Sequence, residues 1–234
     1  MNPIVTRRMP VLREIAPPPD LQNLLDRYRA WGGRVDYVLL RGKVPPTMTS
    51  ESLHHEAAVR FLEAMHHRRL RETKGSFFIT FDADKARGLP ISTPQFVGSS
   101  RDRRGFFDVF RQDPSSYAGA FCSRPYDVSP GREEVAAWRS SQEPPRASAS
   151  PPREQETEGN YQQIARQMVQ SLFEDINTGL FGDLNDSRIE VWAWSSDWSN
   201  YFDWESGYPE EAYLWTVDVP AKKWIVALGT SPSY

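Results

Sequence analysis

The chain has 234 residues, of which 39% are hydrophobic and 12% aromatic, and its formal net charge is −3. This apolar content is sufficient for a folded core and excludes a wholly disordered protein. The sequence contains no run of 18 apolar residues, so a membrane-spanning helix is not expected.

Charge is distributed unevenly along the chain. Residues 159–234 contain four basic and eleven acidic residues, a net charge of −7, so residues 1–158 carry +4. The sequence pI of about 5.9 lies well below the value of about 9 that is typical of nucleic-acid-binding domains. Because an acidic surface repels phosphate, nucleic acid is not an expected partner.

Two features indicate the cellular compartment. Residues 1–15 include basic residues but no continuous apolar segment followed by a cleavage site, so a secretory signal is not expected. Cys122 is the only cysteine and cannot form an internal disulfide, which favours a structural thiol in a reducing compartment. The sequence therefore predicts a cytoplasmic protein.

Residues 1–138 are predicted to form an N-terminal α+β domain. Apolar residues at helical spacing, ended by glycines, predict helices, and alternation between polar and apolar residues predicts strands. In chain order, the predicted elements are a helix over 20–33, a strand over 34–40, a long helix over 50–72 capped by Ser50, and strands over 76–82, 105–110 and 116–123.

The rest of the chain is predicted to be a linker and a second unit. Residues 139–158 consist of Pro, Ser, Ala and charged residues with no large apolar side chain, which is typical of a flexible linker or exposed loop. Residues 159–234 predict a helix over 160–179 and an antiparallel meander of three strands over 188–194, 211–219 and 223–229. The whole protein is therefore expected to be α+β.

No catalytic residue, metal site or cofactor is assigned, because no motif for one is complete. His55 and His66 lie on nearly the same side of the predicted helix, but about 16 Å apart along its axis, too far to share a zinc ion. Arg41 and Gly42 at a strand end resemble the first motif of arginine-type ADP-ribosyltransferases, in which the arginine holds the dinucleotide phosphates. The Ser-Thr-Ser and Glu-x-Glu motifs of that family are absent, and a structural Arg41 before a turn explains the same residues.

Residues 191–215 have the most unusual composition in the chain. They include five tryptophans, three tyrosines, one phenylalanine and five acidic residues, with no lysine or arginine. Alternation assigns the ends of this segment to strands, but residues 195–211 form a long connection that strand pairing does not explain. Three interpretations remain: a core shared with the upstream domain, an acidic aromatic surface for a basic protein partner, or a carbohydrate site with tryptophans stacked on sugar rings.

The pattern W-S-x-D-W-S-x-Y-F-D begins at Trp194 and is followed by a pair of predicted strands. It resembles the ends of small bacterial proteins encoded beside secreted toxins, some of which are immunity proteins, over about 45 residues of this chain. The resemblance implies stoichiometric binding of a basic toxin domain. We therefore predict a non-catalytic immunity-type or adaptor protein, with an ADP-ribosyltransferase-like enzyme or a carbohydrate-binding module as alternatives. The predicted partner-binding residues are Asp197, Trp198, Tyr201, Phe202, Asp203, Trp204, Glu205, Tyr208, Glu210 and Glu211.

Overall fold

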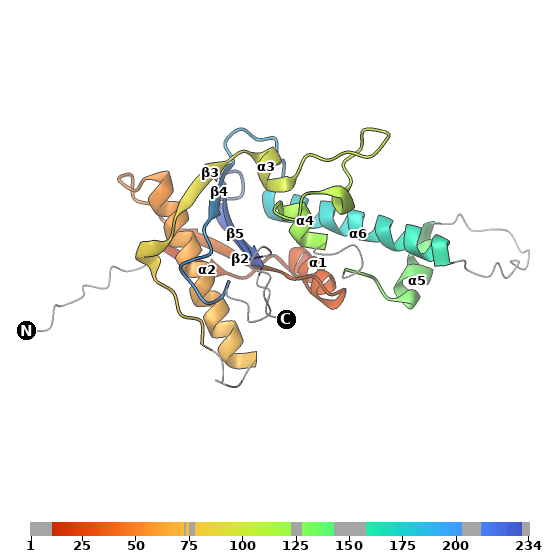
Figure 1. Ribbon diagram of the computed structural model, residues 1–234, viewed down its shortest axis with the longest axis horizontal. Coiled ribbons are helices and arrows are strands. Elements are labelled where there is room, and N and C mark those ends of the chain that lie inside the picture. The colour runs from red at the N-terminus through yellow and green to blue at the C-terminus, as the bar shows by residue number, and fades with distance from the viewer. Residues whose placement is uncertain are drawn as a thin grey trace, which may run out of the picture. The chain divides into compact units, whose positions relative to one another are not determined.

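The computed structural model describes residues 11–72, 74, 78–122, 128–142, 158–202 and 212–230 (Figure 1). The chain divides into two compact units, and each is built from segments that are far apart in the sequence. The first unit comprises Met1–Pro17, Val35–Phe96 and Phe181–Tyr234, and the second comprises Pro18–Arg34 and Val97–Leu180.

A six-stranded antiparallel sheet forms the frame of the first unit. Its strand order is β1-β2-β6-β5-β4-β3, so the three C-terminal strands form the predicted meander and β2 extends it beside β6. The strands are β1 (Leu12–Ile15), β2 (Val35–Gly42), β3 (Gly88–Ile91), β4 (Glu190–Trp194), β5 (Tyr213–Val219) and β6 (Trp224–Thr230). The sheet and the helices together confirm the α+β class.

The register of β4 and β5 decides which side chains share a face. Glu190 is paired with Asp218, Trp192 with Thr216, and Trp194 with Leu214. Because alternate residues of a strand point to the same face, these six side chains lie on one face of the sheet.

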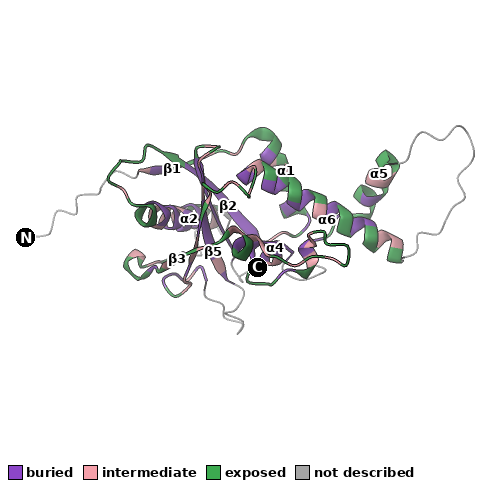
Figure 2. Cartoon of the chain, turned by 90° about the horizontal axis from the view of Figure 1, so that it is seen from above, coloured by how far each residue is buried: buried purple, intermediate pink, exposed green. Residues whose placement is uncertain are grey.

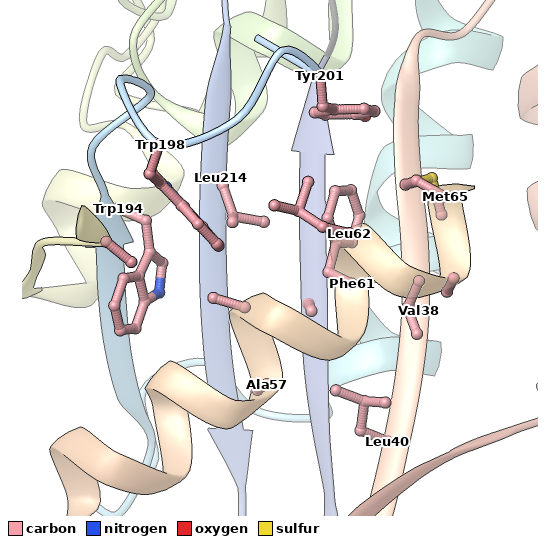
Figure 3. Packing of buried hydrophobic residues seen from close by; sticks show 14 of the residues in the cluster. Val38, Leu40, Ala57, Phe61, Leu62, Met65, Trp194, Trp198, Tyr201 and Leu214 are labelled. Carbon is pink, nitrogen blue, oxygen red and sulfur yellow. The ribbon is translucent and has the colours of Figure 1, made fainter. Parts of the chain in front are cut away.

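Helix α2 (Ser50–Glu72) packs on this face (Figure 3). Its N-cap is Thr49 rather than the predicted Ser50, because the Thr49 hydroxyl accepts the Ser52 amide at 3.2 Å. The helix approaches β6 closely at Gly229, where a Cβ would lie 2.8 Å from the Phe61 ring. The α2 side chains buried in this core are Leu53, Ala57, Ala58, Phe61, Leu62, Ala64 and Met65.

Helices and aromatic side chains build the second unit. Tyr28 stacks on Phe121 with ring centroids 4.1 Å apart and donates a hydrogen bond to the Phe121 carbonyl at 2.9 Å. Phe121 also meets Phe173 edge to face at 5.0 Å. Figure 2 shows that α1 and α6 have alternating buried and exposed residues, as expected for amphipathic helices. The helices are α1 (Pro19–Ala30), α4 (Tyr117–Cys122), α5 (Arg132–Gln142) and α6 (Glu158–Phe181).

Short elements complete the described chain, and several differ from the prediction. The predicted strand over 116–123 is wrong, since Tyr117–Cys122 is helix α4. The predicted strand over 105–110 is also wrong, because only an isolated bridge and a 3-10 turn occur there. Of the predicted strand over 76–82, residues 76 and 77 lie outside the described residues and Phe81 forms only an isolated bridge with Ser199. The short helices are η1 (Ala83–Lys85), α3 (Thr93–Val97) and η2 (Val109–Arg111).

The division into units differs from the predicted boundary at residues 139–158. Residues 139–142 belong to α5, and residues 143–157 lie outside the described residues. The helix predicted to cover the meander is α6, which is assigned to the second unit up to Leu180, and within the first unit α2 covers one face of the meander. Within the described part of the chain, no helix has the length and apolar character needed to cross a membrane.

Candidate functional site

Three of the five aromatic residues predicted to bind a partner lie in the core of the first unit. Trp198 and Tyr201 are each 2% exposed, and Phe202 is 3% exposed. Tyr201 meets Phe61 of α2 edge to face at 5.5 Å and donates a hydrogen bond to Asp36 at 3.1 Å. Figure 3 shows Trp198 beside Leu214 and Tyr201 beside Phe61 and Leu62. These three side chains therefore stabilise the fold and are not available to a partner.

Hydrogen bonds join the segment 198–200 to residues 78–82. The Asp82 amide donates to the Trp198 carbonyl at 2.8 Å, and the Asn200 side chain bonds both Thr80 and Phe78. The Trp198 indole donates to the Ser195 carbonyl at 2.6 Å, so its only polar atom is satisfied inside the core.

Of the seven other predicted partner-binding residues, the structure describes one. Asp197 is exposed. Asp203, Trp204, Glu205, Tyr208, Glu210 and Glu211 lie outside the described residues. The structure therefore brings together Trp198, Tyr201 and Phe202, but in the core.

A second cluster, around His54 of α2, lies on the same sheet face and was not predicted. The His54 side chain is 0% exposed, and its Nδ1 lies 2.8 Å from the Thr216 hydroxyl. The Trp194 indole donates to that hydroxyl at 3.0 Å. The His54 ring stacks on Trp192 with centroids 5.6 Å apart. The buried Thr216 hydroxyl group on β5 therefore contacts side chains of both α2 and β4.

The second ring nitrogen of His54 is unusual for a buried polar atom. Nε2 has no hydrogen-bond partner and lies 3.9 Å from a Glu190 carboxylate oxygen. Burial lowers the pKa of His54 from 6.5 to about 4, and a hydrogen bond with the Thr216 backbone opposes this shift only in part. The imidazole is therefore neutral at pH 7, and its contact with Glu190 is not an ion pair.

Glu190 is the point where this cluster reaches the surface. Its side chain is 55% exposed. One carboxylate oxygen accepts a hydrogen bond from Ser50, which lies one helical turn before His54 in α2. Asp218 lies directly across from it on β5. Burial first, and then the charge of Glu190, raise the pKa of the Asp218 carboxyl.

Basic side chains in the described part of the chain do not neutralise either carboxylate of this pair. Among the described residues, no lysine or arginine forms a salt bridge with Glu190 or Asp218. Like charges at directly opposed positions of an antiparallel pair destabilise a sheet. We call Glu190, Asp218 and the neighbouring Trp192 the carboxylate face.

An open groove of about 580 Å³ adjoins the carboxylate face. Glu190, the partly exposed Trp192 and Ser50 line it. Residues of β3, of α3 and of the loop before β4 complete the lining. In this loop Asp186 is already paired with Arg188 at 2.7 Å. The remaining lining residues are Pro90, Ile91, Ser92, Thr93, Pro94, Leu184, Asn185, Ser187, Ile189 and Val191.

The second unit has a groove of about 640 Å³ that is lined by residues of both charge signs, including Arg166 and Asp108. Arg166 lies over the Phe110 ring at 4.7 Å, and Asp108 is paired with Arg111 at 3.2 Å. The carboxylate face is the stronger candidate site because its two carboxylates are directly opposed and have no lysine or arginine partner among the described residues.

The arrangement of these residues does not resemble an activated nucleophile. Ser50 donates to a carboxylate rather than to an imidazole, and an imidazole with a pKa of about 4 is a weak base. Burial and the charge of Asp108 raise the pKa of the Cys122 thiol to about 12, which opposes thiolate formation. Arg41 donates to the Lys223 carbonyl at 3.2 Å, and this contact supports a structural role.

The histidines bind separate partners along α2. His55 Nε2 lies 2.9 Å from the Ala83 carbonyl, and His66 accepts the Ile79 amide at 3.1 Å. Across the described ranges, no group of three His, Cys, Asp or Glu side chains is placed to hold a metal ion. The polar partners of three of the histidines are therefore protein groups.

The carboxylate face was partly visible in the sequence. Alternation places Glu190 with Trp192, and Asp218 with Thr216, on one side of their strands. Alternation does not predict the strand register that sets the two acids opposite each other. It also does not predict that α2 brings His54 close to them. Comparison with known proteins adds no relative, since no family model, curated protein or solved structure matches the chain.

Proposed function

We propose that the protein is a non-catalytic binding module, of immunity or adaptor type, that engages a basic protein partner through the carboxylate face. The observation that carries this proposal is the pair of opposed carboxylates, Glu190 and Asp218, without a lysine or arginine partner among the described residues. A partner that supplied positive charge here would relieve their repulsion.

The charge distribution of the chain supports a positively charged partner. Residues 159–234 carry −7, and four of their acidic residues are in the connection 203–211. A negative region of this size accelerates association with a basic protein and disfavours acidic competitors. The partly exposed Trp192 offers the kind of aromatic contact that contributes most affinity in interfaces.

The immunity-type assignment, and with it a bacterial and cytoplasmic setting, rests on the resemblance of the W-S-x-D-W-S-x-Y-F-D segment. The aromatic residues of this pattern include Trp198, Tyr201 and Phe202, which are buried. The pattern is therefore evidence for a similar core, and the surface that selects a partner can differ between such proteins.

The proposal is tested by capturing partners with the tagged full-length chain and with two charge-matched double variants. Glu190→Gln with Asp218→Asn neutralises the carboxylate face, whereas Asp20→Asn with Asp84→Asn removes the same charge from exposed positions elsewhere. We expect a basic protein to be recovered at equal stoichiometry by the wild type and by the Asp20/Asp84 variant, and to be lost from the Glu190/Asp218 variant. Recovery of the same partner by both variants would contradict the proposal.

A further inference from the structure

We infer that the groove beside Glu190 receives an arginine side chain of the partner, stacked on Trp192 and hydrogen-bonded to the Glu190 carboxylate. This inference rests on the proposed function and specifies the chemistry of the contact. Its evidence is a carboxylate that lines the groove beside an aromatic ring, together with two further acceptor groups, on Asp218 and His54, that lie next to this carboxylate but outside the groove lining.

The first part of that evidence is the set of acceptors. Glu190 presents a carboxylate that is 55% exposed, and Asp218 lies directly across the strand pair from it. His54 Nε2, fully buried and without a hydrogen-bond partner, lies 3.9 Å from the same carboxylate. When Nδ1 donates to Thr216, Nε2 of the neutral ring carries a lone pair. The matching guest has several N–H donors and a positive charge.

The second part is the aromatic wall. Trp192 is two residues from Glu190 on β4, so both side chains lie on the same face, and both line the groove. The ring stacks near-parallel on His54 at 5.6 Å and on Trp194 at 6.2 Å, and it stays partly exposed. These neighbours fix its orientation while its exposed part can contact a cation, and this reduces the ordering cost of binding.

The third part is the fixed position of the carboxylate. Ser50, one turn before His54 on α2, donates a hydrogen bond to Glu190. Both residues on the helix therefore contact the same side chain on β4. A carboxylate held at one oxygen still has lone pairs for a guest on the other oxygen.

These features favour arginine over lysine. The guanidinium group is planar, stacks on aromatic rings and makes paired hydrogen bonds to carboxylates, whereas the lysine ammonium is a strongly hydrated point charge. The groove volume of about 580 Å³ is sufficient for a long side chain.

The inference is tested by titrating the full chain with a short neutral-capped peptide, Ala-Arg-Ala-Arg-Ala, and with its lysine counterpart. The readout is the indole N–H resonance of Trp192 in a nitrogen-15 spectrum, assigned with Trp192→Phe. Glu190→Gln keeps the size of the side chain and its contact with Ser50 but removes the charge. Asp84→Asn, at an exposed residue outside the groove, serves as the charge-matched control.

We expect the arginine peptide to shift the Trp192 resonance, and to bind at least about tenfold more weakly to Glu190→Gln than to the wild type or Asp84→Asn. We also expect the lysine peptide to bind more weakly than the arginine peptide. Equal affinity for the two peptides, or an unchanged affinity in Glu190→Gln, would overturn the inference.

Partner capture separates this inference from the proposed function. If the chain recovers its basic partner but the Trp192 resonance does not respond to the arginine peptide, the arginine site is wrong and the binding function stands. If the peptide binds at Trp192 but no basic protein is recovered through the carboxylate face, the proposed function is wrong.

Discussion

Replacing Trp198 with alanine distinguishes a core residue from a surface anchor. Its side chain is 2% exposed and meets Phe81 edge to face at a centroid distance of 6.2 Å. Its indole N–H donates to the Ser195 carbonyl. Removing a buried tryptophan costs about 3 to 5 kcal/mol through lost burial and the cavity left behind. The lost hydrogen bond adds about 1 kcal/mol. We therefore expect the free energy of unfolding to fall by about 4 kcal/mol or more.

Urea unfolding followed by tryptophan fluorescence measures this change. Six of the eight tryptophans lie in the first unit, so the signal reports mainly on the sheet and its core. Because the total stability of a domain is of order 5–15 kcal/mol, Trp198→Ala can be largely unfolded. Trp198→Phe keeps a ring in the site, and we expect a smaller loss of about 1 to 2 kcal/mol.

The matched control is Phe78→Ala, because Phe78 is 58% exposed. A substitution at such a position changes stability by less than about 0.5 kcal/mol. The assignment of Trp198 to the core would be refuted if Trp198→Ala were as stable as this control, with an unchanged dependence of the free energy of unfolding on urea concentration.

Three further predictions concern buried or opposed ionisable groups. Because burial lowers the pKa of His54 from 6.5 to about 4, its contribution to stability is complete above pH 6.5 and is lost as the pH falls toward 4. Over this range the free energy of unfolding falls by about 3 kcal/mol. His54→Gln should therefore show a smaller fall in urea midpoint between pH 7 and pH 5 than the wild type, and an identical fall would contradict this assignment. Because burial and Glu190 raise the pKa of Asp218, its ionised form destabilises the fold at pH 7 but not below pH 3.8. Asp218→Asn should therefore raise the free energy of unfolding by about 0.5 kcal/mol at pH 7 and bring no gain at pH 3, and a gain of equal size at both pH values would refute the charge argument. Cys122 is buried and its pKa is raised to about 12, so an aromatic disulfide reagent should modify it only as the chain opens in urea; modification of the native chain at the rate of a free cysteine peptide would show this to be wrong.

The elements predicted correctly are those with long or regular patterns. The stripe of apolar residues over 50–72 predicts α2, and alternation with a Pro-Ala-Lys-Lys turn predicts the β5–β6 hairpin. The segment 116–123 is predicted as a strand because it is short and is separated from the preceding strand candidate by turn residues. Its aromatic residues, Tyr117 and Phe121, are in fact four residues apart, and both are buried on one side of helix α4. That spacing was the helical signal, but the segment is too short for periodicity to decide.

The candidate site was harder to predict because it depends on contacts between distant segments. The length and aromatic content of the connection after β4 are compatible with a core shared with the upstream domain and with a binding surface, and the predicted partner-binding residues follow from the second interpretation. Trp198, Tyr201 and Phe202 are buried where residues 78–82, more than a hundred positions away, bond to Trp198 and Asn200. His54 likewise reaches Thr216 across 162 positions. No local pattern encodes either pairing, so one sequence alone gives no signal for them.

The most direct test of the central claim is hydrogen exchange of the full chain with and without the basic partner that it captures. The claim is that the partner binds at Glu190, Asp218 and Trp192. We expect slower exchange on binding in residues 184–192 and at the start of α2 near Ser50, with the buried segment 198–202 unchanged. Protection confined to the second unit, or found only in 198–202, would contradict the account.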